Sequence, residues 1–181
     1  MTKLRRILKC KAGNGFPLVV AITLALILIL CGVMEFFRLN IIASGAKEAL
    51  QDAIIVTVND NYADVYHGVR EGYSGGYLPD GSSFSYSVDT GDVYGHMDST
   101  LGTTVENGKH MKYSGDVLEY KLSGLEVTVR NAPLAPSSPR NAQRFEADAV
   151  ILLEVPVQFG GKQLPPMKIK LKVQAGYIEV F

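Results

Sequence analysis

An uncharged apolar run near the N-terminus gives way, without a break in helical spacing, to an amphipathic pattern. Residues 16–34 form 19 consecutive positions without a charged side chain. A helix of that length spans about 28 Å, close to the hydrocarbon thickness of a bilayer. We therefore expect a membrane-spanning helix over residues 16–38, with Phe16 and Met34 at the ends of its uncharged run.

Beyond residue 38 the apolar residues narrow to a stripe on one side of the helix. They recur at intervals of three and four, with polar residues between them, which predicts an amphipathic continuation over residues 39–58. The stripe comprises Leu39, Ile42, Ala46, Ala49, Leu50 and Ala53. The apolar face of the protein's own sheet is the obvious cover, although a helix of a neighbouring subunit would satisfy the same pattern.

The region after the long helix is divided into short elements. A short helix is expected to run to about residue 71, and its candidate N-caps are Asn59, Asp60 and Asn61. Glycines and a Pro-Asp-Gly sequence then predict turns. A short strand over residues 84–88 and a short helix over residues 93–101 complete this region.

The last third of the chain alternates apolar and polar residues as β-strands do. Strands are expected over residues 125–130, 145–157 and 167–173, with a final short strand at 177–181. A proline-rich loop joins the first two of them. Pro156 has no backbone N–H, so it indicates a bulge or a sheet edge.

The strand over residues 167–173 carries a lysine at every second position, and these lysines are Lys168, Lys170 and Lys172. Lysines along one face of a strand are common at an exposed sheet edge, where they oppose pairing with another chain. The sequence FGGKQLPP, residues 159–166, is expected to form the turn before this strand.

Together these elements predict the α+β class: a long N-terminal transmembrane-plus-amphipathic helix packed on an antiparallel β-meander head. The chain then divides into four parts. They are a basic stub (1–15), a transmembrane helix (16–38), its amphipathic continuation (39–58) and an extracytoplasmic head (59–181).

Basic residues are concentrated at the N-terminus. The first twelve residues contain five Lys or Arg side chains and no acid, so the rest of the chain carries 13 basic and 18 acidic side chains. The positive-inside rule therefore places the N-terminus in the cytoplasm and the head outside the cytoplasmic membrane, on a single-pass anchor. The acidic excess elsewhere argues against nucleic acid as a partner.

The two cysteines, Cys10 and Cys31, are too far apart along a helix to form a disulfide within one molecule, so the head must fold on its core alone. Cys31 follows Leu30 rather than a small residue, which argues against a lipid-modified cysteine. A cleaved secretory signal is also disfavoured, because the apolar run exceeds about 15 residues and no small-x-small site follows it.

The residues at the end of the span form the pattern G-x-x-E-F-x-R-L, made of Gly32, Glu35, Phe36, Arg38 and Leu39. Preceded by a basic stub and an apolar run, and followed by regularly spaced alanines, this pattern resembles TadE-like minor pilins of tight-adherence (Flp-type) pilus systems. The resemblance covers about residues 10–57. It implies a pilin-like fold in the bacterial cell envelope, with pilus subunits or assembly proteins as partners.

Prepilins of such systems carry a glycine at the cleavage site and a glutamate five residues into the mature chain. Gly13 and Gly15 are the candidate processing glycines. The residues five positions later are Leu18 and Val20 rather than glutamate. Cleavage by a prepilin peptidase and ordinary packing into a filament shaft are therefore left open.

Glu35 and Arg38 stand three positions apart, which allows an ion pair on one side of the helix. Two interpretations follow. The pair can lie hydrated at the outer interface and mark where the helix leaves the membrane. Alternatively, it can contact a partner helix, because charges near a bilayer are costly unless they are paired or hydrated.

Tyrosines crowd the region after the helix, and four of them form a candidate recognition surface: Tyr62, Tyr66, Tyr73 and Tyr77. Packing within the head is the alternative. The histidines are expected at the surface or in loops, at positions 67, 96 and 110. The aspartates at positions 80, 89, 92 and 98 lack the spacing of a calcium loop and are expected in a solvated loop.

No catalytic triad, phosphate-binding loop or metal-ligand spacing occurs in the sequence, so we expect neither an enzyme nor a cofactor or metal site. The leading hypothesis is a single-pass, membrane-anchored, pilin-like protein, a structural or accessory component of a Flp-type pilus or secretion assembly. A signal-anchored exported binding module unrelated to pili is the alternative. In both cases the lipid bilayer is a partner.

Overall fold

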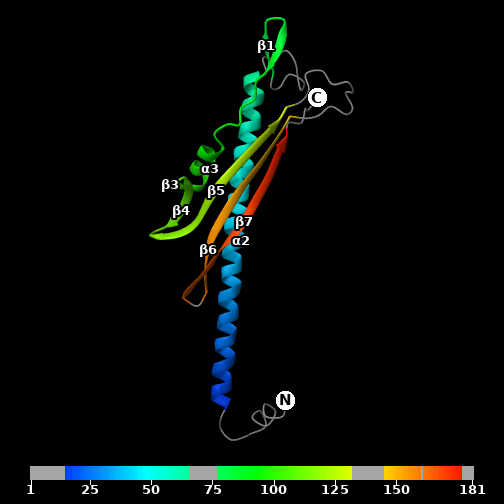
Figure 1. Ribbon diagram of the computed structural model, residues 1–181. Helices are drawn as coiled ribbons and strands as arrows, with labels where there is room; N and C mark the ends of the chain where they lie inside the picture. Colours follow the sequence, from blue (N-terminus) through cyan, green and yellow to red (C-terminus); the bar gives the residue numbers. More distant parts are fainter. Residues whose placement is uncertain (1–14, 66–76, 132–144, 160, 177–181) are drawn as a thin grey trace, which may run out of the picture.

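A computed structural model describes residues 15–65, 77–131, 145–159 and 161–176 of the protein. One helix, α2, runs from Gly15 to Val65 without interruption. Figure 1 shows a sheet lying obliquely along the C-terminal part of this helix, with the β6–β7 hairpin reaching furthest toward its N-terminus, while the first turns of the helix stand clear of the sheet. The long helix and the α+β class are confirmed.

A five-stranded sheet follows the helix. Its strands are β3 (Thr104–Glu106), β4 (Lys109–Ser114), β5 (Val117–Arg130), β6 (Glu146–Phe159) and β7 (Lys162–Gly176). They pair in chain order, and every pair is antiparallel. The predicted meander is therefore confirmed, although the prediction omitted β3, β4 and the first half of β5.

Two smaller elements lie between helix and sheet along the chain. Strands β1 (Tyr77–Asp80) and β2 (Ser83–Tyr86) form a separate hairpin, so the predicted strand at 84–88 begins and ends earlier than expected. Helix α3 spans Val93–Leu101, as predicted. The Asp92 carboxylate accepts a hydrogen bond from Gly95 N–H at its start, which caps the helix.

The separate helix predicted to begin at residues 59–61 is wrong, because α2 continues through them to Val65. Asn61 has another role: its side-chain nitrogen donates to the carbonyls of Thr57 and Asp89, and its side-chain oxygen accepts from the Asp89 N–H. The buried amide thereby ties the helix to the segment that leads into α3. The remainder of the predicted short helix and the strand at 177–181 lie outside the described residues.

Strands β6 and β7 are longer than predicted on the side of their shared turn. β7 already begins at Lys162, so most of the predicted FGGKQLPP turn is strand. Pro156 stands at a shift of register between β6 and β7, which confirms the predicted bulge. β7 is the last strand of the sheet, and its three alternating lysines are exposed, as expected of an edge.

The amphipathic stripe of α2 packs on the protein's own sheet. Ala46, Ala49, Leu50 and Ala53 are all at most 3% exposed, and Ala46, Leu50 and Ala53 belong to one core cluster with side chains of β6 and β7. The main partners on the sheet are Ala147, Ala149, Ile151, Leu153, Val155, Leu171 and Val173. Small residues on both surfaces let the helix backbone approach the sheet closely. The stripe is therefore covered by the protein's own sheet rather than by a helix of a neighbouring subunit.

Candidate functional site: the junction of helix and hairpin

The N-terminal half of α2 is apolar on all sides and uncovered. Phe16 is 79% exposed and Met34 is 63% exposed, and the most apolar window of the helix contains no buried residue. Within the described residues this is the one helix long and apolar enough to cross a membrane. Gly15 is the first residue of the helix, while Gly13 lies outside the described residues.

Glu35 and Arg38 form the ion pair that their spacing allows. Nε of Arg38 donates to Oε2 of Glu35 at 3.1 Å, and Nη2 of Arg38 donates to Oε1 at 2.9 Å. The two parallel hydrogen bonds fix the plane of the guanidinium group. Both side chains are partly exposed, and the pair also contacts the sheet of the same chain.

The same pair holds the far end of strand β6. Nη2 of Arg38 also donates to the carbonyl oxygen of Pro156 at 2.7 Å. The Glu35 carboxylate lies within hydrogen-bonding reach of the backbone N–H of Gln158. The bulge at Pro156 interrupts the ladder with β7, and the two charged side chains satisfy backbone groups beside that interruption.

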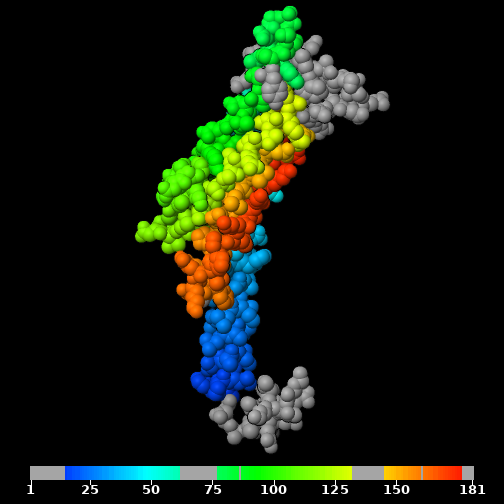
Figure 2. All heavy atoms as spheres, in the orientation of Figure 1, coloured from blue at the N-terminus to red at the C-terminus, as the bar shows by residue number. Residues whose placement is uncertain are grey.

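Gly32 completes the junction one turn earlier on the helix. A Cβ atom at this position would lie 3.9 Å from Cε2 of Phe159, so the aromatic ring passes directly over the glycine. Figure 2 shows the β6–β7 hairpin beside the helix, below the rest of the sheet. Gly32, Glu35 and Arg38 therefore all lie beside the end of β6. We call the adjoining residues 157–159 and 161–164 the hairpin tip.

The two other motif residues face different surroundings. Leu39 is half-buried and packs against the core. Phe36 is 63% exposed, and its ring lies 6.1 Å from that of Phe37. Phe36 thus remains free for lipid or a partner, whereas the rest of the motif serves contacts within the chain.

A partly buried cluster of polar side chains joins α3 to the sheet. Nδ1 of His110 lies 2.7 Å from Oδ1 of Asp98, and the His110 ring stacks on Tyr94 with 3.8 Å between ring centroids. The Tyr94 hydroxyl accepts a hydrogen bond from the Leu125 N–H at 3.0 Å, where β5 shifts register. Thr103 donates to Asp98 as well.

This cluster corrects two predictions. His110 is a buried strand residue, not a surface or loop histidine, and Asp98 is a partly buried helix residue, not part of a solvated loop. The contacts of the cluster tie α3 to strands β4 and β5. The spacing of Tyr94 and Asp98, four apart on a predicted helix, could have placed them on one face, but the register of the unpredicted strand β4 could not be foreseen. His96 is exposed, as expected, and His67 lies outside the described residues.

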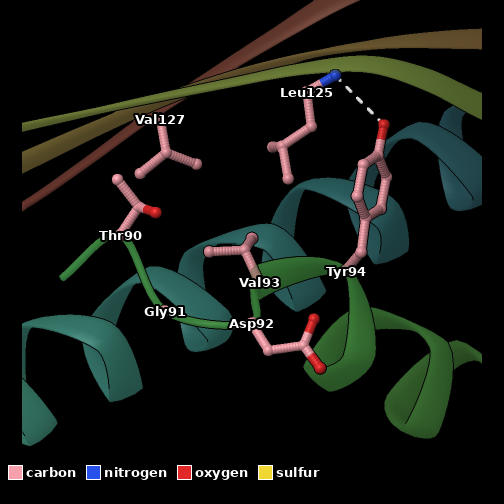
Figure 3. Close-up of a pocket in the computed structure, with 7 residues that line it drawn as sticks. All are labelled: Thr90, Gly91, Asp92, Val93, Tyr94, Leu125 and Val127. Carbon is pink, nitrogen blue, oxygen red and sulfur yellow. Dashed lines mark hydrogen bonds between the residues drawn. The ribbon is translucent and has the colours of Figure 1, made fainter.

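A pocket of about 280 Å³ lies between β5 and the segment that begins α3. Figure 3 shows Leu125 and Val127 on one side of it and Thr90 and Val93 on the other, with the hydrogen bond from Leu125 to Tyr94 at its end. The carboxylate in its lining, that of Asp92, already caps α3. The described lining of the pocket thus combines apolar side chains with a carboxylate that serves the helix.

The candidate recognition surface is only partly described. Tyr77 is half-buried on β1, while Tyr66 and Tyr73 lie outside the described residues. Tyr62 belongs to the last turn of α2, and its side chain also lies outside the description. The recognition surface over these four tyrosines therefore stays a prediction.

Among the residues that the structure describes, no three His, Cys, Asp or Glu side chains come together as metal ligands would.

No family model matches the chain, and no curated protein and no solved structure matches it either. Function is therefore inferred from the residues and their geometry.

Proposed function

We propose that the protein is a single-pass, membrane-anchored, pilin-like component of a Flp-type pilus or secretion assembly, with its N-terminus in the cytoplasm and its head outside. In this role it is a structural or accessory subunit rather than an enzyme. The lipid bilayer and other pilin-like subunits or assembly proteins are its partners.

The observation that carries the proposal is that two parts of α2 have different surroundings. Residues 16–34, which we call the bare half, are exposed apart from Gly32. Residues 39–58, which we call the docked half, pack on the sheet. The bare half presents large aliphatic side chains on every side, and these side chains are exposed. Such a surface can sit in lipid, and it can equally be covered by the bare helices of other subunits, because both surroundings are apolar. A subunit that passes from a membrane into a filament needs a helix with this property.

The position of the G-x-x-E-F-x-R-L motif also supports the proposal. Gly32, Glu35 and Arg38 hold the sheet at the C-terminal end of the bare half. Phe36, a fourth residue of the motif, points outward. The motif thereby holds the head in a fixed orientation above the anchor. A fixed orientation matters to an assembling subunit more than to a freely tethered domain.

Gene deletion with complementation in the native bacterium tests this function. We expect loss of surface pili on deletion, rescue by the full chain, and co-purification of the protein with pilus components. A matched chimera, in which residues 16–34 are replaced by the span of an unrelated single-pass protein, should restore anchoring but not pili. Unchanged pili on deletion, together with no co-purification, would refute the assignment.

A second candidate is a signal-anchored binding module. The absence of glutamate five residues after Gly13 or Gly15 favours it, as does the use of Glu35 within the chain. The intact mass of the protein from its native envelope separates the two in part: loss of the stub at either glycine indicates prepilin processing. Ligand capture by the head in cells without pilus proteins would favour the module.

A further inference from the structure

The inner face of the sheet stays apolar down to the hairpin tip, where α2 covers it only in part. Along β6, Leu153 and Val155 are fully buried, Val157 is half-buried and Phe159 is 43% exposed. β7 shows the same gradient, because Leu171 is buried, whereas Leu164 is 48% exposed. A hairpin tip surrounded by water would be expected to become polar where its cover ends.

The register of the hairpin places its apolar side chains on one face. Val157 pairs with Leu164, and Phe159 pairs with Lys162, so these four side chains lie on the same side of the ladder. The pair between them, Gln158 with Gln163, points to the opposite side. The tip therefore has an apolar face that ends in one lysine.

The height of this face relative to the anchor is fixed by direct contacts. Phe159 lies over Gly32, which is two positions before the end of the uncharged run at Met34. Two residues correspond to about 3 Å along a helix axis. The tip thus reaches the level at which the predicted span meets the outer interface.

We propose that the hairpin tip is a second membrane contact, with Phe159 and Leu164 inserted into the interfacial layer of the outer leaflet. Lys162 lies beside the phospholipid phosphates, since aromatic and lysine side chains are the usual anchors at this depth. This inference rests on the membrane anchor of the proposed function but not on any role in a pilus. Two contacts at one level fix both the depth and the tilt of the head.

The chain contains no tryptophan, which makes single-tryptophan depth measurements straightforward. Full-length Phe159→Trp is reconstituted at low protein density in phosphatidylcholine–phosphatidylglycerol vesicles whose acyl chains carry bromine either near the headgroup or near the chain end. Leu26→Trp in the bare helix is the control for the anchor. Phe84→Trp, on the exposed β1–β2 hairpin, is the control for a head position in water.

We expect blue-shifted emission from Phe159→Trp, quenched strongly by shallow bromine and weakly by deep bromine. Leu26→Trp should be quenched most by deep bromine, and Phe84→Trp by neither. If Leu26→Trp is quenched but Phe159→Trp is not, the tip lies in water or against a second copy, and the inference is overturned. If Leu26→Trp itself escapes quenching, the anchor of the proposed function fails instead.

Discussion

Residues 16–34 and residues 39–58 belong to one α-helix, yet they use opposite kinds of side chain. Leu, Ile and Val dominate the first part, which is exposed apart from Gly32, whereas alanines recur in the buried stripe of the second part. In lipid a helix needs apolarity on all sides and no particular fit. Against a sheet it needs a stripe whose small residues permit close packing. The change between these two demands occurs at Gly32–Leu39.

The largest effect should come from the same truncation made in each half. Leu50 is fully buried, so Leu50→Ala is expected to lower the free energy of unfolding of the head by about 2–5 kcal/mol. Leu26→Ala removes the same atoms from the bare half and should leave that free energy unchanged. Urea unfolding of the full chain in detergent micelles, followed by circular dichroism, measures both. Equal losses would mean that the two halves are not in different surroundings.

A charge placed in each half should give the reverse pattern in the membrane. Leu26→Arg is expected to disfavour insertion by about 2.5–3.5 kcal/mol, because a charge at the centre of a span must leave water. Glu48→Arg, on the exposed polar side of the docked half, should not change insertion. The fraction of protein that resists alkaline extraction from membranes reports the difference. An equal response to both substitutions would contradict the boundary.

The junction between the halves should show an intermediate effect. Arg38→Gln removes the hydrogen bond to Pro156 and leaves Glu35 without its partner, with an expected cost of about 1–3 kcal/mol. Arg130→Gln is the matched control, because Arg130 forms exposed ion pairs with Glu146 and Asp148 that should contribute at most about 1 kcal/mol. If both substitutions cost the same in urea unfolding, the junction has no special role.

The smallest effect concerns pH and should be confined to the head. Glu154 is buried between Lys121 at 2.9 Å and Lys168 at 3.1 Å, and these lysines hold the pKa of its carboxyl below the ordinary value of 4.5. A lowered pKa in the folded state means that this carboxylate stabilises the head above pH 4.5 and loses that contribution as the pH falls through its lowered pKa.

Glu154→Gln should therefore be less stable than the wild type at neutral pH, by about 1 kcal/mol or less, and the difference should vanish in acid. Residues 16–34 contain no carboxylate or histidine, so the membrane anchor should not respond over this pH range. Urea midpoints measured at pH 7 and pH 3 test the head, and extraction at the two pH values tests the anchor. A difference that grows on acidification would give the wrong sign.

The sequence was most informative where one physical demand dominates over many residues. The bare half, the stripe, the long strand β6 and the lysines of β7 each repeat one pattern, and the structure confirms all four. Helix α3 was predicted as well, and the structure shows Asp92 and Gly102 as its caps. Strands β3 and β4 were missed because their segment, TVENGKHMKYS, mixes charged and apolar residues without alternation.

The contacts of the junction could not be predicted from the sequence in the same way. The spacing of Glu35 and Arg38 predicts their ion pair, but the bond to Pro156 joins residues 118 positions apart. It depends on the length of β6 and on the bulge, which together set how far down the helix the hairpin reaches. His110 was misplaced for the same reason, because its burial depends on the pairing of β4 with β5.

The central claim is that the two halves of α2 lie in different surroundings, one in lipid and one against the sheet. The most direct test of this claim is the reactivity of single cysteines along α2. In a chain with Cys10 and Cys31 replaced by serine, cysteine is introduced at Leu26, Ile41 or Leu50, and the vesicle-bound protein is treated with a membrane-impermeant maleimide. Only Ile41→Cys should react at first, because Ile41 is 72% exposed beyond the span. In urea Leu50→Cys should become reactive while Leu26→Cys stays protected by lipid. Reaction at Leu26→Cys under either condition would contradict a membrane-embedded half of the helix.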